Sequence, residues 1–296
     1  MAELTEIELS DVAATSLVTL YCHALETQTP KPILEDAKAV EIVDKLNPLL
    51  SESPNKLRRD LAQGKLDKRL IVHIALRARR YDEYVNQFLK ISPDGLVVNI
   101  GCGFDTRFFR LDNGKADFYD LDLPEVIEVK KKLLQETDRY RFIASSVLDY
   151  EWMDLLSCCK GRPFLFLAEG VFMYLHADAV KTLILKLQSH FPGSEIVCEV
   201  INSLWLNKWL KPMIDFKLQR QLHLGKGATF HFGIKNSSQI EQWGDGIEFL
   251  DDWTYLDDPE PKLGLLRIMR HFELFRKTQW TVHYRLNKKT PEPVKK

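Results

Sequence analysis

Two glycines that flank a single residue, Gly101 and Gly103, follow an apolar run in the segment VVNIGCGFDTRFFRL, residues 97–111. In an open parallel sheet, ligands bind beyond the carboxyl ends of the strands, and a glycine there lets the backbone come close to the ligand. The segment is therefore typical of a buried strand that runs into a nucleotide- or nucleoside-binding turn. Tight turns that bind nothing also use such glycines, so the assignment depends on a second feature.

Asp122 supplies that second feature. It closes the next predicted strand, in YDLDLPE, 21 residues after Gly101, and an acid at this spacing accepts hydrogen bonds from ribose hydroxyls. Asp120, on the same face of that strand, competes for the role. A different interpretation makes Asp122 the N-cap of a helix that begins at Pro124. Its combination with the glycine turn favours the ribose role.

Thr106 narrows the choice of ligand. A dinucleotide site uses a third glycine for close helix–strand packing and a helix N-terminus for the pyrophosphate. Here Thr106 stands in that glycine's place, and only a short segment separates the turn from the next predicted strand. S-adenosylmethionine carries no phosphate, so it needs the glycines and the acid but not the helix. We therefore predict S-adenosylmethionine as the cofactor, with an NAD-dependent oxidoreductase as the less favoured alternative.

The elements that must position these residues change character at Gly95. Before it, apolar residues recur at steps of three and four, as on one helix face: Ile71, Ile74, Ala78, Tyr81, Val85 and Phe88. After it, strand-like segments alternate with helical ones: LVVNI, ADFYDLD, YRFIAS, PFLFLAE and SEIVCEVI. This alternation predicts an α/β fold with a doubly wound, mostly parallel sheet that helices cover on both faces.

The carboxyl-terminal part departs from this alternation. IEFLDDWTYL and TQWTVHYRL alternate like strands on either side of a helical LLRIMRHFELF, which suits a sheet whose last strand runs antiparallel. We expect three parts. They are an N-terminal helical lid and cofactor-clamp segment at 1–90, a cofactor-binding core at 91–286 with a helical insertion at about 202–227, and a disordered tail at 287–296.

Composition and charge argue against several classes of protein. The formal net charge is −1, so no global field favours nucleic acid or an anionic membrane. The longest apolar run, Phe164 to Leu175, is too short to span a bilayer, and the acidic start MAELTEIELS lacks the build of a signal peptide. We therefore expect a cytoplasmic protein. Five cysteines without C-x-x-C spacing and eight scattered histidines predict reduced thiols and no metal site.

Glu169 and Tyr174 are the candidates nearest the reaction. Glu169 ends the predicted strand PFLFLAE, whose tip would line the site, and its carboxylate could receive the amino group of the cofactor's methionine or balance its sulfonium. A structural carboxylate that caps the next turn is the alternative. Tyr174 is predicted to position the acceptor, although an aromatic residue after VFM is as often part of a core.

Longer stretches resemble a known family. NIGCGFDTRFFRL, YDLDLPEVIEVKK, AEGVFMYL and FGIK…QWGDGIEFLDD are similar to motifs of the leucine carboxyl methyltransferase and polyketide-synthesis O-methyltransferase family, from about residue 70 to the last predicted strand. The chain resembles the bacterial polyketide branch more than the phosphatase-modifying branch. Phe104 replaces the usual leucine, and Asp36-Ala37 stands where many members have Asp-Pro. These departures concern the substrate lid and not the cofactor site.

The resemblance implies a seven-stranded sheet that binds S-adenosylmethionine, with Arg77 on the cofactor's carboxylate. It also implies an adenine site formed by Ser146, Val147 and Asp149. From the residues alone, Arg77 falls at the edge of the helical apolar stripe, where an arginine usually packs its stem and keeps its head in water. Arg79 and Arg80 lie further round the helix, where we expect solvent.

Together these features predict an S-adenosylmethionine-dependent O-methyltransferase that acts on a hydroxyl or carboxyl group of a small molecule, such as a polyketide-like metabolite. A carboxylate acceptor is already ionised at neutral pH and needs no base, whereas a hydroxyl would be helped by one, with these candidates: His23, His176, Glu169 and His231. We assign no base. The alternatives are carboxyl methylation of a protein C-terminus and a catalytically silent module that binds S-adenosylmethionine.

Overall fold

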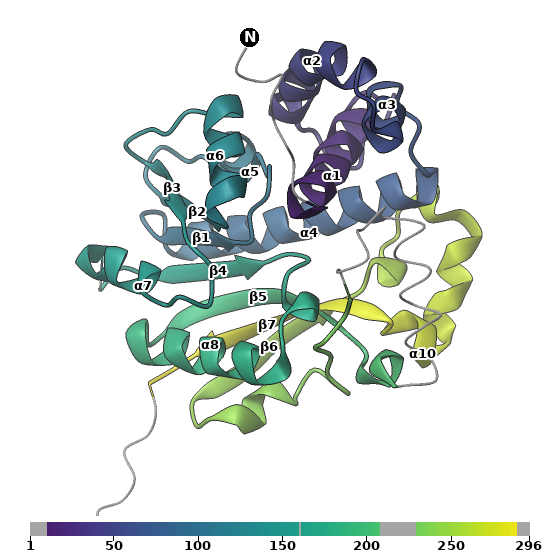
Figure 1. Ribbon diagram of the computed structural model, residues 1–296. Helices are drawn as coiled ribbons and strands as arrows, with labels where there is room; N and C mark the ends of the chain where they lie inside the picture. Colours follow the sequence, from purple (N-terminus) through teal and green to yellow (C-terminus); the bar gives the residue numbers. More distant parts are fainter. Residues whose placement is uncertain (1–10, 160, 208–228, 289–296) are drawn as a thin grey trace, which may run out of the picture.

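A computed structural model describes residues 11–159, 161–207 and 229–288 (Figure 1). Its centre is a seven-stranded sheet in the order β3-β2-β1-β4-β5-β7-β6. The strands are β1 Leu96–Ile100, β2 Asp117–Asp122, β3 Tyr140–Ala144, β4 Phe164–Ala168, β5 Ser194–Ile201, β6 Ile247–Trp253 and β7 Gln279–Leu286. The first five pair in parallel, and β7 runs antiparallel to both β5 and β6. The predicted mostly parallel, seven-stranded sheet is confirmed.

The order of the strands reverses at β1. This strand pairs with β2 on one side and with β4 on the other. The chain first adds β2 and β3 on one side of β1 and then crosses over to add β4 and β5 on the other side. All five residues of β1 are buried, as expected for a central parallel strand covered on both faces. Ligands bind open sheets of this kind in the crevice at such a switch point. The glycine turn begins directly after β1, at Gly101.

Helices cover both faces of the sheet. On one face, α4 (Lys68–Ile91) and α5 (Arg107–Leu111) pack against one apolar cluster of strand residues, and on the other α7 (Trp152–Leu155) and α8 (Ala177–His190) pack against a second. The apolar stripe predicted on α4 is buried except for Ile71. The remaining helix beside the sheet, α6 (Pro124–Leu133), follows β2. Because helices bury an apolar cluster on each face, the sheet is doubly wound, as predicted.

The N-terminal segment is helical, as predicted. It contains α1 (Asp11–Thr27), α2 (Ala37–Ser51) and α3 (Lys56–Ala62), which stand together over α4 (Figure 1). Their apolar side chains form a core of their own, which reaches Phe104 of the glycine turn and Val126 of α6. The helices therefore pack directly on the loops at the carboxyl end of the sheet.

The segment LLRIMRHFELF differs from the single helix that was predicted. Residues Pro261–His271 form a 3₁₀ helix that is kinked at Gly264, where φ is +52°, and α10 (Glu273–Arg276) follows. Gly264 precedes the segment, which is itself interrupted at Phe272, where the backbone is extended with φ of −110° and ψ of 105°. The helical insertion predicted at 202–227 lies mostly outside the described residues, which include its 3₁₀ helix Ser203–Leu206 but not residues 208–227. The predicted tail lies outside them from residue 289 on.

Candidate active site

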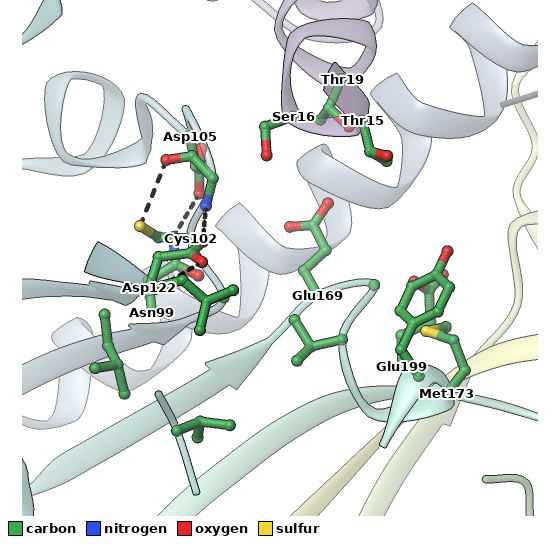
Figure 2. Close-up of a pocket in the computed structure, with 18 of the residues that line it drawn as sticks. Thr15, Ser16, Thr19, Asn99, Cys102, Asp105, Asp122, Glu169, Met173 and Glu199 are labelled. Carbon is green, nitrogen blue, oxygen red and sulfur yellow. Dashed lines mark hydrogen bonds between the residues drawn. The ribbon is translucent and has the colours of Figure 1, made fainter. Parts of the chain in front are cut away.

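A cavity of about 520 Å³ opens at the carboxyl ends of β1, β2, β4 and β5. Its floor is the glycine turn and the loops that leave the strands, and α1 faces it from above with Thr15, Ser16 and Thr19 (Figure 2). Glu169 projects into the space between the turn and α1 (Figure 2). The cavity thus lies at the switch point of the sheet, where the sequence predicted a ligand.

The glycine turn is fixed by backbone bonds and by its neighbours. The N–H groups of Gly101 and Cys102 both donate to the Leu121 carbonyl, over 2.8 and 3.1 Å. Gly101 and Gly103 adopt φ of +63° and +49°, a region that favours glycine. A Cβ at Gly103 would lie 2.5 Å from Ser16 Oγ, and one at Gly101 2.4 Å from Val171 Cγ2. These glycines are required because protein side chains already occupy the space that a Cβ would fill.

Asp122 reaches this turn, whereas Asp120 does not. Asp122 Oδ2 accepts from the Gly103 N–H over 2.7 Å and Oδ1 from the Leu123 N–H over 2.8 Å, and the side chain lines the cavity. Burial raises the pKa of Asp122, although these backbone donors oppose the rise. The N-cap position of α6 is Leu123, so the helix-cap interpretation of Asp122 is wrong. Asp120 instead pairs with buried Lys130 at 2.6 Å and accepts from the Tyr140 hydroxyl at 2.6 Å.

Glu169 lies between two guanidinium groups. Its Oε1 is 2.8 Å from Arg77 Nε and its Oε2 is 2.7 Å from Arg107 Nη2. Burial opposes ionisation, but Arg77 and Arg107 outweigh it and hold the pKa of Glu169 below its usual range. Arg77 in turn donates from Nη1 to Glu199 Oε2 over 3.0 Å. The structure therefore brings Arg77 and Glu169 together in the cavity wall, both ionised.

A chain of buried ion pairs continues from Glu169 toward the N-terminal helices. Arg107 also pairs with Asp105 and, from Nε, with Asp82 Oδ1 at 2.7 Å. Arg110 joins Asp82 to Asp36, which His23 and Thr106 also contact. Burial alone would raise the pKa of Asp105, but the charges of Arg107 and Arg110 outweigh this effect and lower the pKa to about 2. The N-terminal helices are therefore tied by charge to the turn after β1.

Sequence reasoning missed most members of this chain. The one available signal was the spacing of Arg107 and Arg110, which places both on one face of α5. Arg79 and Arg80 were predicted to reach solvent, but their side chains are only 31% and 21% exposed and both form ion pairs. Arg79 Nη2 lies 2.8 Å from both carboxylate oxygens of Asp258, and Arg80 Nη2 lies 2.6 Å from Asp251 Oδ2. The outer face of α4 is covered by the segment that includes β6, which the helical wheel alone does not show.

The adenine residues implied by the resemblance separate into two groups. Ser146 and Val147 line the cavity, on the loop that follows β3. Asp149 is exposed, and its backbone N–H donates to the Ser146 carbonyl over 3.1 Å. The structure thus brings the first two residues to the site and leaves the Asp149 side chain outside it.

Apolar side chains form the other end of the cavity. Met173 and Tyr174 come from the 3₁₀ helix Phe172–Tyr174, and Phe230 lies 5.4 Å from Tyr174 between ring centroids, at an interplanar angle of 54°. Burial, and to a lesser extent Glu199, raises the pKa of Tyr174 to about 12. Glu199 and Gln279 complete this end from β5 and β7. Of these residues, sequence reasoning had identified Tyr174.

The histidines proposed as bases take different positions. His23 lines the cavity, and its Nδ1 lies 3.1 Å from Asp36 Oδ2. His231 also lines the cavity, with its ring centroid 4.6 Å from that of His176 and its Nε2 3.0 Å from Thr229 Oγ1. None of these contacts identifies one of the three histidines as the base.

Within the described ranges, no three or more His, Cys, Asp or Glu side chains are grouped so as to hold a metal ion. The cysteines described as free are Cys22, Cys102, Cys159 and Cys198. Burial raises the pKa of the Cys102 thiol in the turn, which disfavours a nucleophilic role. No helix in this part of the chain is long and apolar enough to cross a membrane.

The model of the leucine carboxyl methyltransferase family matches residues 16–188, from the middle of α1 to the end of α8. This match includes the glycine turn, Asp122 and Glu169. The chain belongs to the leucine carboxyl methyltransferase family. The predicted class of enzyme, a methyltransferase dependent on S-adenosylmethionine, is thereby confirmed, and the oxidoreductase alternative is not supported.

Individual relatives of this methyltransferase agree with the family match. The tetracenomycin polyketide synthesis O-methyltransferase TcmP of Streptomyces glaucescens is 32% identical and aligns over 86% of both chains. The S-adenosyl-L-methionine-dependent methyltransferase dpfgK of Gibberella zeae is 27% identical over 66% of both chains. A crystal structure of a DUF574 family protein from Streptomyces avermitilis has a TM-score of 0.51 and 11% identity, covering 82% of this chain and 95% of that one. The structural likeness supports the fold alone.

Proposed function

We propose that this methyltransferase transfers the methyl group of S-adenosylmethionine to an oxygen atom of a small molecule, on a hydroxyl or a carboxyl group. The observation that carries the proposal is one continuous cavity with two unlike ends. The glycine turn, Asp122 and the ion-paired Glu169 lie at one end, and Met173 and Tyr174 lie at the other. The name of the relative TcmP, a polyketide synthesis O-methyltransferase, supports a small-molecule acceptor.

The residues at the first end fit S-adenosylmethionine. Each Asp122 oxygen accepts one backbone N–H, and because a carboxylate oxygen has two lone pairs, each can also accept a ribose hydroxyl. Ser146 and Val147 would lie against the adenine. Among the described residues that line the cavity, Arg77 is the one lysine or arginine, which leaves no separate cation for a pyrophosphate and suits a nucleoside without phosphate.

Arg77 and Glu169 would hold the methionine part. A guanidinium has five N–H donors, and the ion pairs with Glu169 and Glu199 use Nε and Nη1 of Arg77. We propose that the donor's carboxylate binds the same guanidinium and that its amino group is received by Glu169. S-adenosylmethionine supplies an electrophilic methyl group at this place.

The chain's own contribution is alignment and exclusion of water. Methyl transfer is an in-line displacement, and fixing the acceptor oxygen opposite the methyl group removes much of the entropic barrier. α1 closes the cavity from above, and its His23 contacts Asp36, which Thr106 and Arg110 bind in turn, so α1 is held over the reacting groups. We propose that Tyr174 positions the acceptor, because it lines the apolar end next to Phe230.

One alternative has specific support. The description of the family as leucine carboxyl methyltransferases favours the carboxyl group of a protein C-terminus as acceptor. This candidate requires an end of the cavity that is open to a chain terminus. It predicts methylation of a peptide with a free C-terminal leucine and no methylation of the same peptide with a C-terminal amide.

Calorimetry with S-adenosylhomocysteine tests the proposal. We expect stoichiometric binding, followed by transfer of label from methyl-labelled S-adenosylmethionine to small molecules that carry hydroxyl or carboxyl groups. A folded protein that does not bind S-adenosylhomocysteine would contradict the proposal. Labelling restricted to the free-leucine peptide would replace it by the alternative.

A further inference from the structure

Arg107 is a buried arginine that lies behind the wall of the cavity. Its side chain is 3% exposed. Among the described residues that line the cavity, its neighbours Asp105 and Glu169 appear but Arg107 does not. It belongs to the stretch GFDTRFF, directly after the glycine turn. A charge buried to this extent is costly unless its partners repay the cost, so the partners of Arg107 indicate what it does.

Three carboxylates from three parts of the fold hold the Arg107 guanidinium. Nε donates to Asp82 Oδ1 of α4 over 2.7 Å, and Nη1 pairs with Asp105 of the turn. Nη2 donates to Glu169 Oε2, after β4, over 2.7 Å. A planar guanidinium has little freedom left when each of its nitrogens is engaged. Arg107 therefore fixes the Glu169 carboxylate relative to both α4 and the glycine turn.

Glu169 needs such a partner because its other cation is shared. Arg77 lines the cavity, already pairs with Glu199, and is the group at which we place the donor's carboxylate. All of these acceptors compete for the N–H groups of one guanidinium. Arg107 is not part of the cavity wall, so its pair with Glu169 is not open to competition from the ligand.

We propose that Arg107 is a positioning residue for the methyl donor: it does not touch the ligand, and it holds the Glu169 carboxylate in the orientation that receives the donor's amino group. This inference rests on the proposed function, which places that amino group at Glu169. Each Glu169 oxygen uses one lone pair on a guanidinium and can accept from the amino group with the other. The site then selects a nucleoside thioether with an amino group over one without it.

The same pair keeps Glu169 charged. Burial opposes ionisation, and Arg77 and Arg107 together hold the pKa of Glu169 below its usual range. The other ionisable groups that face Glu169 are Tyr81 of α4, Asp105 of the turn and Glu199 of β5. Without Arg107, burial and the neighbouring acids would act against Arg77 alone. The pKa of Glu169 would rise, and its charge would be lost as the pH falls through that value.

Two ligands that differ only in the amino group test the inference by calorimetry. They are S-adenosylhomocysteine and its deamino analogue, 5′-S-(3-carboxypropyl)-5′-thioadenosine. We expect the unaltered protein to prefer S-adenosylhomocysteine about 10- to 100-fold, because the analogue lacks a hydrogen bond to a charged group. Arg107→Gln should lower this preference about tenfold.

The possible failures are distinguishable. Equal binding of the two ligands by the unaltered protein, or an unchanged preference in folded Arg107→Gln, would overturn the inference. An unaltered protein that does not bind S-adenosylhomocysteine would count against the proposed function instead.

Arg110→Gln is the matched control. Arg110 lies about one turn further along α5, is similarly buried, and pairs with Asp36 and Asp82 instead of Glu169. Both variants break buried ion pairs of the same chain, so both should lose stability. Arg110→Gln should nevertheless keep the preference for S-adenosylhomocysteine within about threefold. An equal loss of preference in the two variants would reduce Arg107 to a structural role.

The pH dependence of binding separates positioning from loss of structure. From about pH 7.5 to about pH 5.5, the affinity of Arg107→Gln for S-adenosylhomocysteine should fall about tenfold more than that of the unaltered protein or of Arg110→Gln, because Glu169 becomes protonated. The deamino analogue should show no such difference. The same pH profile in all three proteins would contradict the role.

Arg107→Lys carries the test if Arg107→Gln does not fold. Lysine keeps the positive charge but lacks the planar fork that reaches three carboxylates. We therefore expect it to lose part of the preference for S-adenosylhomocysteine while its pH profile stays that of the unaltered protein. An unchanged preference in Arg107→Lys would show that the orientation of Glu169 does not depend on the guanidinium.

Discussion

The two ends of the cavity are built in opposite ways. At the donor end, residues 99–147 come from the tips of β1, β2 and β3, which are neighbours in both sequence and sheet, and backbone N–H groups hold Asp122. Arg77 of α4 and Glu169 after β4 join them from elsewhere in the chain. The acceptor end combines residues 173–174, 199, 229–231 and 279 from distant parts of the chain. We therefore expect the cofactor to be bound mainly by residues that lie close together in the chain, and the acceptor by residues from distant parts of it.

The largest effect should come from an acid that belongs to neither end. Asp120→Asn leaves Lys130, which is fully buried, without its carboxylate partner. We expect a loss of about 3–5 kcal/mol in the free energy of unfolding, measured by chemical denaturation. The affinity of the folded protein for S-adenosylhomocysteine should change less than about threefold. A large loss of affinity without loss of stability would assign the ribose role to Asp120.

Asp122→Asn tests the donor end two residues further along the same strand. Removing the charge weakens a hydrogen bond to a charged group, which contributes about 1.5–3 kcal/mol. We therefore expect affinity for S-adenosylhomocysteine to fall about 10- to 100-fold in calorimetry. Naphthol, a flat aromatic probe for the end of the cavity lined by Tyr174 and Phe230, should bind unchanged to protein saturated with S-adenosylhomocysteine. Equal weakening of both ligands would show that the two ends are not independent.

Gly103→Ala tests the packing of α1 over the turn. The added Cβ meets Ser16 Oγ at 2.5 Å and φ is +49°, so we expect a loss of about 1–3 kcal/mol in unfolding free energy. Gly114→Ala is the control, because φ there is +77° and nothing lies within 4 Å of its Cβ, so it should lose only about 1 kcal/mol. Equal losses in the two variants would show that α1 does not press on the turn.

Phe230→Ala tests the acceptor end. We expect the affinity for naphthol to fall about tenfold, because a stacking surface is lost, while the affinity for S-adenosylhomocysteine stays the same. Calorimetry on the same protein preparation measures both. The opposite pattern, with the donor product weakened and naphthol unaffected, would reverse the assignment of the two ends.

The sequence was sufficient for the donor end because its signals are local. The glycine pair and Asp122 lie within one short stretch, residues 101–122, and the structure places them together in the wall of one cavity. The ribose role of Asp122 stays a prediction until a ligand is seen.

The acceptor end could not be predicted in the same way. Glu199 looked like one more residue of a buried strand, because its partner Arg77 lies 122 residues away in the chain. Arg79 and Arg80 were assigned to solvent because a helical wheel contains no information about what packs on its outer face. The kink at Gly264 depends on a backbone conformation that glycine permits but does not require.

A crystal structure with S-adenosylhomocysteine is the most direct test of the central claim, that the methyl donor occupies the end of the cavity formed by the glycine turn. We predict the ribose hydroxyls within hydrogen-bond distance of Asp122, the adenine against Ser146 and Val147, and the homocysteine part at Arg77 and Glu169. A ligand bound elsewhere, or one whose ribose does not contact Asp122, would contradict the account.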